Sequence, residues 1–172
     1  EYLLRATKDA NRLLGMVNEL LDFSLSESQG LSLSYARVDL VALVQDVLQS
    51  FREQADARHI TLKYAPKDPS LIADVDLSRM RRVLINLVEN AIKFSDMDDK
   101  VLVKVESLNG NAIISVIDQG CGIPEGDYSR IFEKYYQVNH NPNKNTFGMG
   151  LGLYIATLIV EAHGGSISVK VS

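Results

Sequence analysis

Two asparagines and a lysine are spaced so that one helix would present all three along one side. Asn86, Asn90 and Lys93 lie within about 60° of one another if the chain turns by about 100° per residue, as in an α-helix. Asparagine is a poor helix former, so two of them on one stripe indicate a specific ligand. Amide oxygens suit Mg²⁺, which takes few protein ligands, and a lysine ammonium can meet a phosphate as a point charge. A polar helix face without a ligand is the alternative, and the stripe alone does not decide between them.

A second candidate site is the run D-Q-G-C-G-I-P at residues 118–124, directly after an expected strand. A carboxylate at a strand end, here Asp118, can accept a hydrogen bond from an exocyclic amine, and glycines at alternate positions let a flat base approach the backbone. The D-x-G-x-G pattern alone is weakly specific, because many turns contain it. Cys121 has no histidine or cysteine motif near it in the sequence, so we expect it to pack rather than act as a nucleophile.

A third candidate site is the run G-M-G-L-G-L at residues 148–153, which opens an expected helix. Glycines before a helix leave backbone N–H groups available, and the positive end of the helix dipole lies beside them, so an anion can bind there. The spacing differs from the dinucleotide-binding fingerprint, and no Walker-type lysine and serine follow it. The pattern therefore predicts an anion site of another kind.

The elements that must position these groups alternate between helices and strands. Asp39 and Asp76 are expected N-caps, the first for a helix with an apolar inner side and the second for a helix over Leu77–Phe94. The run N-G-N at residues 109–111 separates two β-branched strands and predicts a hairpin. The remaining expected elements are strands at 60–64, 71–75, 101–106, 112–117 and 166–171 and a helix at 151–162. This order predicts an α+β fold, a two-layer sandwich of a mixed or mostly antiparallel sheet with helices on one face.

Residues 1–27 have a different pattern. Apolar residues recur there with a seven-residue spacing, which is typical of a helix in a helical bundle. These positions are Leu3, Ala6, Ala10, Leu13, Val17 and Leu20. A polar connector at 24–34 follows, so we divide the chain into a bundle helix at 1–30 and a domain at 31–172. A helix that packs on its own domain is the alternative.

Composition argues against several classes of function. The chain has 172 residues, 46% of them hydrophobic and 23% charged, and a net charge of −4 without a basic run, which argues against a general nucleic-acid binder. The longest apolar stretch, at 151–160, is too short and too polar to span a bilayer, so we expect no membrane segment in this chain. The single cysteine, with neither an initiator methionine nor a signal peptide, favours an excised cytoplasmic piece of a longer protein.

Four runs of the sequence together resemble a known family, the sensor histidine kinases. The run N-L-V-E-N-A-I-K-F-S resembles the family's asparagine box, and the run D-Q-G-C-G-I-P resembles its first glycine box. The run I-F-E-K-Y-Y-Q resembles the phenylalanine box, and the run G-M-G-L-G-L-Y-I resembles the second glycine box. The N-terminal run N-R-L-L-G-M-V-N-E-L-L-D-F-S is similar to the second helix of the family's dimerisation and phosphoacceptor hairpin. The resemblance implies the Bergerat ATP-binding fold, in which ATP lies under a mobile lid, here expected at about 125–147.

The resemblance also implies roles for individual residues. Asn90 would coordinate Mg²⁺, while Asn86 and Lys93 would face the triphosphate. Asp118 would accept a hydrogen bond from the adenine amine. Lys134 stands where the family often has an arginine that reaches the terminal phosphate, and it completes the expected catalytic set with the two asparagines and Lys93. The other implied cofactor-binding positions are Gly120, Gly122, Ile123, Tyr135, Gly148, Gly150, Leu151 and Gly152.

Two departures from the family pattern bear on the reaction. Related ATPases that hydrolyse ATP with water place a glutamate general base one turn before the metal-binding asparagine, where this chain has Asn86. An amide cannot accept a proton, so the sequence favours phosphoryl transfer over hydrolysis. The family's phosphoacceptor histidine lies in an S-H-E-x-R-T-P-like run that this chain lacks, and none of His59, His140 and His163 is in a matching context.

The function that the resemblance implies is that of an ATP-dependent protein histidine kinase domain. It would transfer the γ-phosphoryl group of ATP to a histidine on a helix absent from this chain, in signal transduction to a response regulator with a receiver domain. In the parent protein the helix at 1–30 would form a homodimer, and the ATP-binding domain at 31–172, which is short at its C-terminus, would be cytoplasmic. The alternatives are another Bergerat-fold ATPase or serine kinase, and a non-catalytic interaction module that binds no nucleotide.

Overall fold

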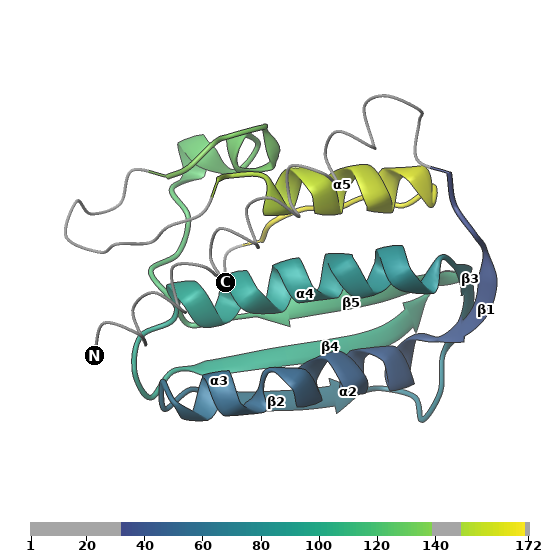
Figure 1. The fold of residues 1–172 in the computed structure, drawn as a ribbon, viewed down its shortest axis with the longest axis horizontal. Coiled ribbons are helices and arrows are strands. Elements are labelled where there is room, and N and C mark those ends of the chain that lie inside the picture. Colours follow the sequence, from purple (N-terminus) through teal and green to yellow (C-terminus); the bar gives the residue numbers. More distant parts are fainter. Residues whose placement is uncertain (1–31, 139–148, 171–172) are drawn as a thin grey trace, which may run out of the picture.

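Helices and strands alternate along the part of the chain that the computed structural model describes, residues 32–138 and 149–170 (Figure 1). The expected α+β class is confirmed. In chain order the elements are β1 (Ala36–Asp39), α2 (Leu40–Ser50), α3 (Arg52–Asp56), β2 (Thr61–Pro66), β3 (Ile72–Val75), α4 (Leu77–Phe94), β4 (Lys100–Leu108), β5 (Asn111–Ile117), the 3₁₀ turns η1 (Glu125–Asp127) and η2 (Arg130–Phe132), and α5 (Gly152–Ala162).

The strands form a mixed sheet and a separate short pair. The sheet has the order β2-β4-β5, in which β2 and β4 are parallel and β4 and β5 are antiparallel. The predicted hairpin joins β4 to β5, and its turn residues Asn109 and Gly110 have φ values of 52° and 80°, the positive values that a type I′ turn requires. β1 and β3 pair with each other in antiparallel register, with Ala36 opposite Val75.

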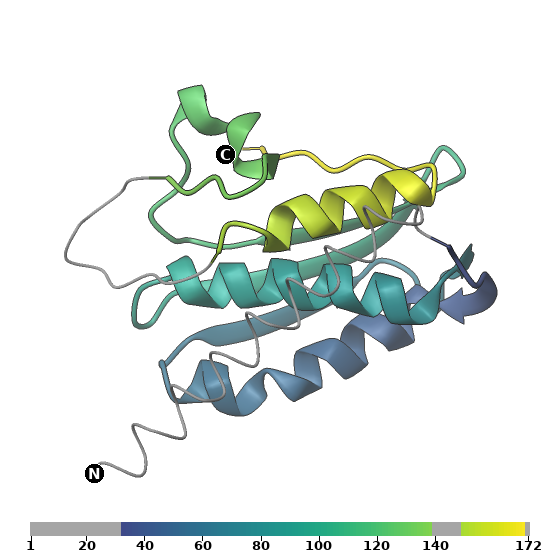
Figure 2. The same cartoon turned by 45° about the horizontal axis from the view of Figure 1, so that its top comes forward.

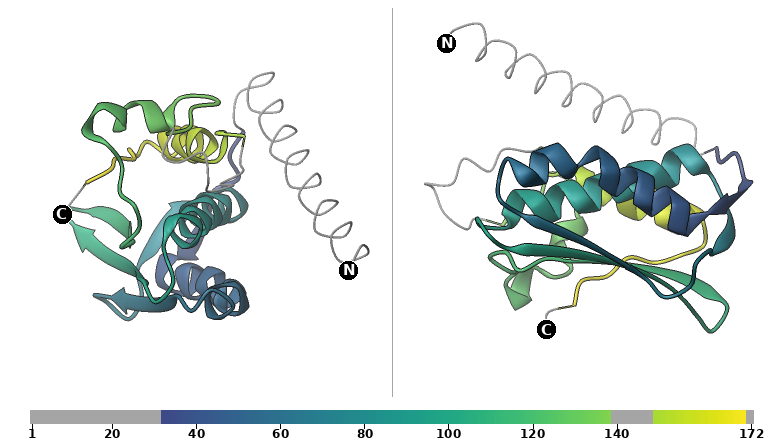
Figure 3. Two further views of the ribbon diagram at one scale, coloured as in Figure 1. Left: turned by 90° about the vertical axis from the view of Figure 1, so that its left-hand side faces the viewer. Right: turned by 90° about the horizontal axis from the view of Figure 1, so that it is seen from below.

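Helix α4 lies between two hydrophobic clusters. Helices α2 and α4 lie side by side over one face of the sheet, and α5 lies on the side of α4 away from α2 (Figures 1 and 2). The larger cluster fills the space between α2, α4 and the sheet, and it includes Val101, Val103 and Val105 from alternate positions of β4. The smaller cluster joins α4 to α5 through Val83 and the buried side of α5. Figure 3 shows this layering end-on.

Two helix starts were predicted from single aspartates, and both are confirmed. Asp39 precedes α2 and Asp76 precedes α4, and each carboxylate accepts a hydrogen bond of 3.0 Å from a backbone N–H in the first turn of its helix. Helix α4 also ends where predicted, at Phe94. These boundaries could be predicted because an N-cap interaction involves only neighbouring residues.

Three features differ from the prediction or lie beyond it. Strand β1 (four residues) and helix α3 (five residues) were not expected. The strand predicted at 166–171 is wrong over its described residues: Ile167 and Val169 are half-buried in alternation, but residues 166–170 pair with no described strand. Alternation indicates which side chains are covered, whereas a strand also needs a backbone partner.

The predicted helix at 1–27 and the domain boundary at residue 30 lie outside the described residues.

The helices of the described residues include none that is long and apolar enough to cross a membrane.

The capping carboxylate of Asp76 is the most strongly perturbed acid of the described residues. It is only 6% exposed and accepts hydrogen bonds from the Ser34 N–H at 2.9 Å, the Arg79 N–H at 3.0 Å and the Ser78 hydroxyl at 2.8 Å. These bonds, the one from Ser34 first, lower the pKa of Asp76 from 3.8 to about 2. Asp76 therefore ties the segment before β1 to the start of α4.

We expect an Asp76→Asn variant to be less stable than the parent chain at neutral pH by about 1–2 kcal/mol, the difference between charge-assisted and neutral hydrogen bonds. Because folding lowers the pKa of Asp76, its stabilising effect is present above pH 3.8 and is lost as the pH falls towards about 2. Urea unfolding at a series of pH values should thus show a steeper loss of stability between pH 4 and 2 in the parent than in the variant. Equal slopes would contradict this account.

Candidate functional site

The predicted polar stripe of α4 begins with a residue that joins two helices. Asn86 is buried, with 7% of its surface exposed, and its amide Nδ2 donates a hydrogen bond to the Gly152 carbonyl oxygen at 2.9 Å. This bond connects the middle of α4 to the first residue of α5. The structure therefore gives Asn86 a role between helices, and contact between Asn86 and a triphosphate stays a prediction.

The other two residues of the stripe lie nearer the end of α4. Asn90 and Lys93 are both half-buried. Since residues four apart lie on the same side of a helix, Asn90 follows Asn86 on the side of α4 that faces the start of α5. The Lys93 ammonium lies 5.0 Å from the centre of the Phe94 ring. An amide and an ammonium group thus stand one turn apart at the end of this helix.

The loop after β5 brings an exposed carboxylate to the same end of α4. The Asp118 carboxylate accepts a hydrogen bond from the Gly120 N–H at 3.0 Å, which holds the loop in a tight turn. A Cβ atom on Gly120 would lie 2.6 Å from the Phe94 carbonyl oxygen, so only glycine allows this approach. The contact places the Asp118 loop directly against the last turn of α4.

The remaining residues of this loop differ in what they contact. Gly122 has a φ of 69° with open space where a Cβ would stand, so its side of the loop is accessible to a ligand. Gly120, in contrast, makes room for α4, and docking of a base against it stays a prediction. Ile123 is half-buried. Cys121 is exposed, so the prediction that it packs in the interior is wrong.

The glycine turn before α5 is held by the segment that follows η2. Gly150 has a φ of 70°, and a Cβ there would lie 2.7 Å from the Tyr136 carbonyl oxygen. Its own carbonyl accepts a hydrogen bond from the Tyr135 N–H at 3.0 Å. Leu151 is fully buried, so only its backbone could contact a ligand, and Gly148 lies outside the described residues. Among the described residues no side chain caps the N-terminus of α5, and binding of an anion there stays a prediction.

The described half of the expected lid, residues 125–138, has its own anchors. The Tyr136 hydroxyl donates to the Asp127 carboxylate at 2.6 Å, and this bond is the main reason that the pKa of Tyr136 is raised. The Arg130 guanidinium lies 4.3 Å from the centre of the Tyr136 ring, and Ile131 is buried. These contacts join the described half of the lid to itself, and its mobility in the absence of nucleotide stays a prediction.

Two further predicted residues lie on this anchored segment. Lys134 is half-buried, and its ammonium lies 5.3 Å from the centre of the Tyr154 ring in the first turn of α5. Tyr135 is 57% exposed and has a φ of 62°, which for a residue with a side chain is maintained only by its surroundings. The cation of Lys134 thus stands beside the same helix start as the glycine turn.

The described residues therefore bring three predicted groups together around the end of α4 and the start of α5. The polar stripe, the Asp118 loop and the glycine turn are joined by the Asn86–Gly152 hydrogen bond and the Gly120–Phe94 contact. Two hollows of the described surface lie elsewhere, one beside α3 and one between η2 and α5.

Comparison with known proteins identifies the family of this chain. The profile of the family described as histidine kinase-, DNA gyrase B- and HSP90-like ATPase matches residues 75–172, and the chain belongs to this family. Within the family it is the catalytic domain of the sensor histidine kinase class, as the relatives and structures below show.

Among curated relatives, the chain is 39% identical over 166 residues to the sensor histidine kinase TmoS of Ectopseudomonas mendocina, covering 95% of this chain and 17% of TmoS. It is 31% identical over 172 residues to the sensor protein SrrB of Staphylococcus aureus, covering 99% of this chain and 29% of SrrB. The chain thus spans less than a third of either relative.

Solved structures agree with this class and with the expected Bergerat fold. Full-length ShkA in complex with AMPPNP superposes with a TM-score of 0.86 at 30% identity, over 99% of this chain and 35% of ShkA. The histidine kinase ThkA in complex with the response regulator TrrA superposes with a TM-score of 0.79 at 26% identity, over 99% of this chain and 47% of ThkA. The histidine kinase AdeS of Acinetobacter baumannii has a TM-score of 0.75 at 28% identity, over 94% of this chain and 74% of AdeS.

Proposed function

We propose that this chain binds ATP together with Mg²⁺ and transfers the γ-phosphoryl group to a histidine that another segment of protein presents. The observation that carries the proposal is that the groups for the two ends of one nucleotide come from separate elements in mutual contact. Asp118, for the base, lies in a loop pressed against Phe94, and Asn90, for the metal, lies one turn earlier on the same helix. The AMPPNP complex of ShkA supports the choice of ATP.

The residues present fit Mg²⁺ as a partner of ATP rather than as a resident metal. The described residues contain no group of three histidine, cysteine or acidic side chains that could hold a metal ion. Mg²⁺ commonly takes one or two protein oxygens and completes its shell with water and phosphate, which matches a single amide oxygen from Asn90. When bound, the ion would supply positive charge that offsets the negative charge on the phosphoryl oxygens.

In this mechanism the chain aligns the reactants and neutralises charge. The incoming imidazole nitrogen forms a bond to the γ-phosphorus while the bond from that phosphorus to the β–γ bridging oxygen breaks, and ADP leaves. Lys93 and Lys134, at the end of α4 and the start of α5, are the cations that would meet the phosphates, together with the N-terminus of α5. Asn86 is already engaged with Gly152 and cannot act as a base, which supports transfer over hydrolysis.

The wider partners of the parent protein form part of the same proposal. The complex of ThkA with TrrA supports a response-regulator receiver domain as the acceptor that follows the histidine. The apolar heptad pattern in residues 1–27 supports a homodimeric helical bundle in the parent protein. A cytoplasmic location, where ATP is available, follows from this function.

The experiment that tests the proposal is incubation of the chain with γ-labelled ATP, alone and with a separate polypeptide that carries the phosphoacceptor hairpin of a sensor histidine kinase. We expect no label on the chain alone, because phosphoryl transfer needs an aligned nucleophile. We expect acid-labile label on the added hairpin, and none when its histidine is replaced by glutamine. Label at a histidine of the lone chain would overturn this account, and steady release of phosphate without an acceptor would favour the hydrolysing ATPase alternative.

A further inference from the structure

The last turn of α4 is held from outside by an arginine that the sequence analysis did not single out. Arg58 lies in the turn between α3 and β2, and its guanidinium donates hydrogen bonds to the carbonyl oxygens of Ile92 and of Ser95, the latter at 3.1 Å. The last carbonyls of a helix have no partners within the helix, and the planar fork of arginine can serve two of them at once. A cation also interacts favourably with the negative end of the helix dipole.

The turn that carries Arg58 is itself firmly placed. The Arg58 and Ile60 N–H groups both donate to the Ala55 carbonyl oxygen, at 3.0 and 2.9 Å. The Ala55 and Ile60 side chains are buried in the main cluster, with 1% and 3% of their surface exposed. Arg58 therefore links a turn held by the buried core to the end of α4.

The Asp118 loop also contacts this helix end. Gly120 approaches the Phe94 carbonyl oxygen so closely that a Cβ would lie 2.6 Å from it. The Ser95 hydroxyl and N–H occupy the Ala91 carbonyl oxygen, at 2.8 and 3.1 Å. The end of α4 is thus contacted both by Arg58 and by the loop that bears Asp118.

We infer that Arg58 is a positioning residue for the nucleotide. This inference rests on the proposed function, in which Asn90 and Asp118 serve the two ends of one ligand. Arg58 binds the carbonyl oxygen of Ile92, which lies two residues after Asn90. At the other end of the ligand, Asp118 lies two residues before Gly120, the residue in contact with Phe94. Arg58 sets where α4 ends, and so sets the distance that one nucleotide must span. It acts through the backbone of α4, because both of its bonds go to main-chain carbonyls.

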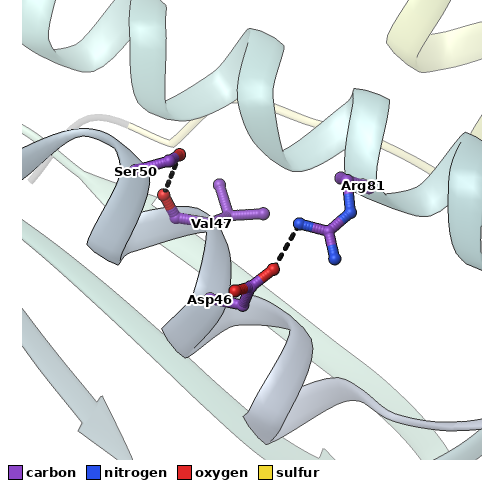
Figure 4. A network of polar contacts seen from close by, with 4 residues as sticks. All are labelled: Asp46, Val47, Ser50 and Arg81. Carbon is purple, nitrogen blue, oxygen red and sulfur yellow. Dashed lines mark hydrogen bonds and ion pairs between the residues drawn. The ribbon is translucent and has the colours of Figure 1, made fainter.

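The test compares Arg58→Gln with a matched control on the same helix. Arg81 in the first half of α4 forms an ion pair with Asp46 on α2 (Figure 4), and its side chain is 41% exposed. Arg81→Gln therefore also removes a guanidinium contact of α4, but far from its last turn. The ligands are the non-hydrolysable ATP analogue AMPPNP with Mg²⁺, measured by calorimetry, and adenosine, measured by NMR titration.

We expect Arg58→Gln to weaken binding of AMPPNP–Mg²⁺ on the order of tenfold, since displacement of a binding group by about 1 Å has effects of this size or larger. Adenosine, which reaches only the Asp118 end, should bind to Arg58→Gln with an affinity within about twofold of its affinity for the parent chain. Arg81→Gln should bind both AMPPNP–Mg²⁺ and adenosine with affinities within about twofold of those of the parent chain. Arg58→Lys keeps the charge but serves one carbonyl, so it should weaken AMPPNP–Mg²⁺ binding by about threefold. If Arg58→Gln does not fold, this lysine variant provides the same comparison.

Two results would overturn the inference. Unchanged binding of AMPPNP–Mg²⁺ by the Arg58 variants would show that the bonds to α4 do not position the nucleotide groups. An equal loss of AMPPNP–Mg²⁺ and adenosine binding would show a general structural role. Failure of the parent chain to bind AMPPNP–Mg²⁺ would instead overturn the proposed function, so the two failures are distinguishable.

Discussion

Replacement of Asp118 by asparagine is expected to remove most of the affinity of this chain for ATP. The carboxylate is exposed and is held by the Gly120 N–H at 3.0 Å, so it is already oriented for a second hydrogen bond. A bond from a base amine to this charged acceptor contributes roughly 1.5–3 kcal/mol, which corresponds to about a 10- to 150-fold change in the dissociation constant. Asparagine keeps the shape but lacks the charge, and its amide nitrogen can face the amine as a second donor.

Calorimetric titration of AMPPNP with Mg²⁺ into the parent chain and the Asp118→Asn variant would measure this effect. Cys121→Ser is the matched control, because Cys121 is an exposed residue of the same loop with no role in the proposed site. The serine variant should bind with the parent affinity, and circular dichroism should show that both variants are folded. Parent-like affinity in Asp118→Asn would mean that the base is recognised elsewhere.

Replacement of Asn90 by alanine is expected to abolish the dependence of ATP binding on Mg²⁺. Asn90 is the one residue of the described stripe assigned to the metal, and alanine is the best helix former, so α4 should keep its structure. The parent chain should bind ATP more tightly with Mg²⁺ than with EDTA, whereas the variant should bind equally in both. Phosphoryl transfer to an added hairpin should fall by about 100-fold or more, because charge neutralisation at the phosphoryl group is lost.

The control for this variant is Glu89→Ala, which changes the exposed neighbour of Asn90 on the same helix. It should retain the difference between Mg²⁺ and EDTA and should support transfer at the parent rate. If Mg²⁺ increases ATP binding by Asn90→Ala as much as by the parent chain, the metal is held by another residue. If Glu89→Ala then loses this increase, the carboxylate of Glu89 is the next candidate for the metal ligand.

Local features of this protein could be predicted from its sequence because they depend on neighbouring residues. Asp39 and Asp76 start their helices through bonds to the next turn. Asn109 and Gly110 form the predicted hairpin, since both residues accept a positive φ. The glycine run before α5 is likewise a local pattern. The glycine run is also one of the four runs whose order predicted the family, which the comparison confirms.

The contacts that assemble the site were decided by the tertiary structure. The Asn86 amide reaches the Gly152 carbonyl, which is 66 residues away in the chain, and Arg58 reaches the Ile92 carbonyl across 34 residues. Each bond ends on a backbone carbonyl, a group that every residue carries, so no residue type at positions 92 or 152 indicates the partner. For the same reason the alternating pattern at 166–170 could predict which side chains are covered but not whether a neighbouring backbone would pair with them.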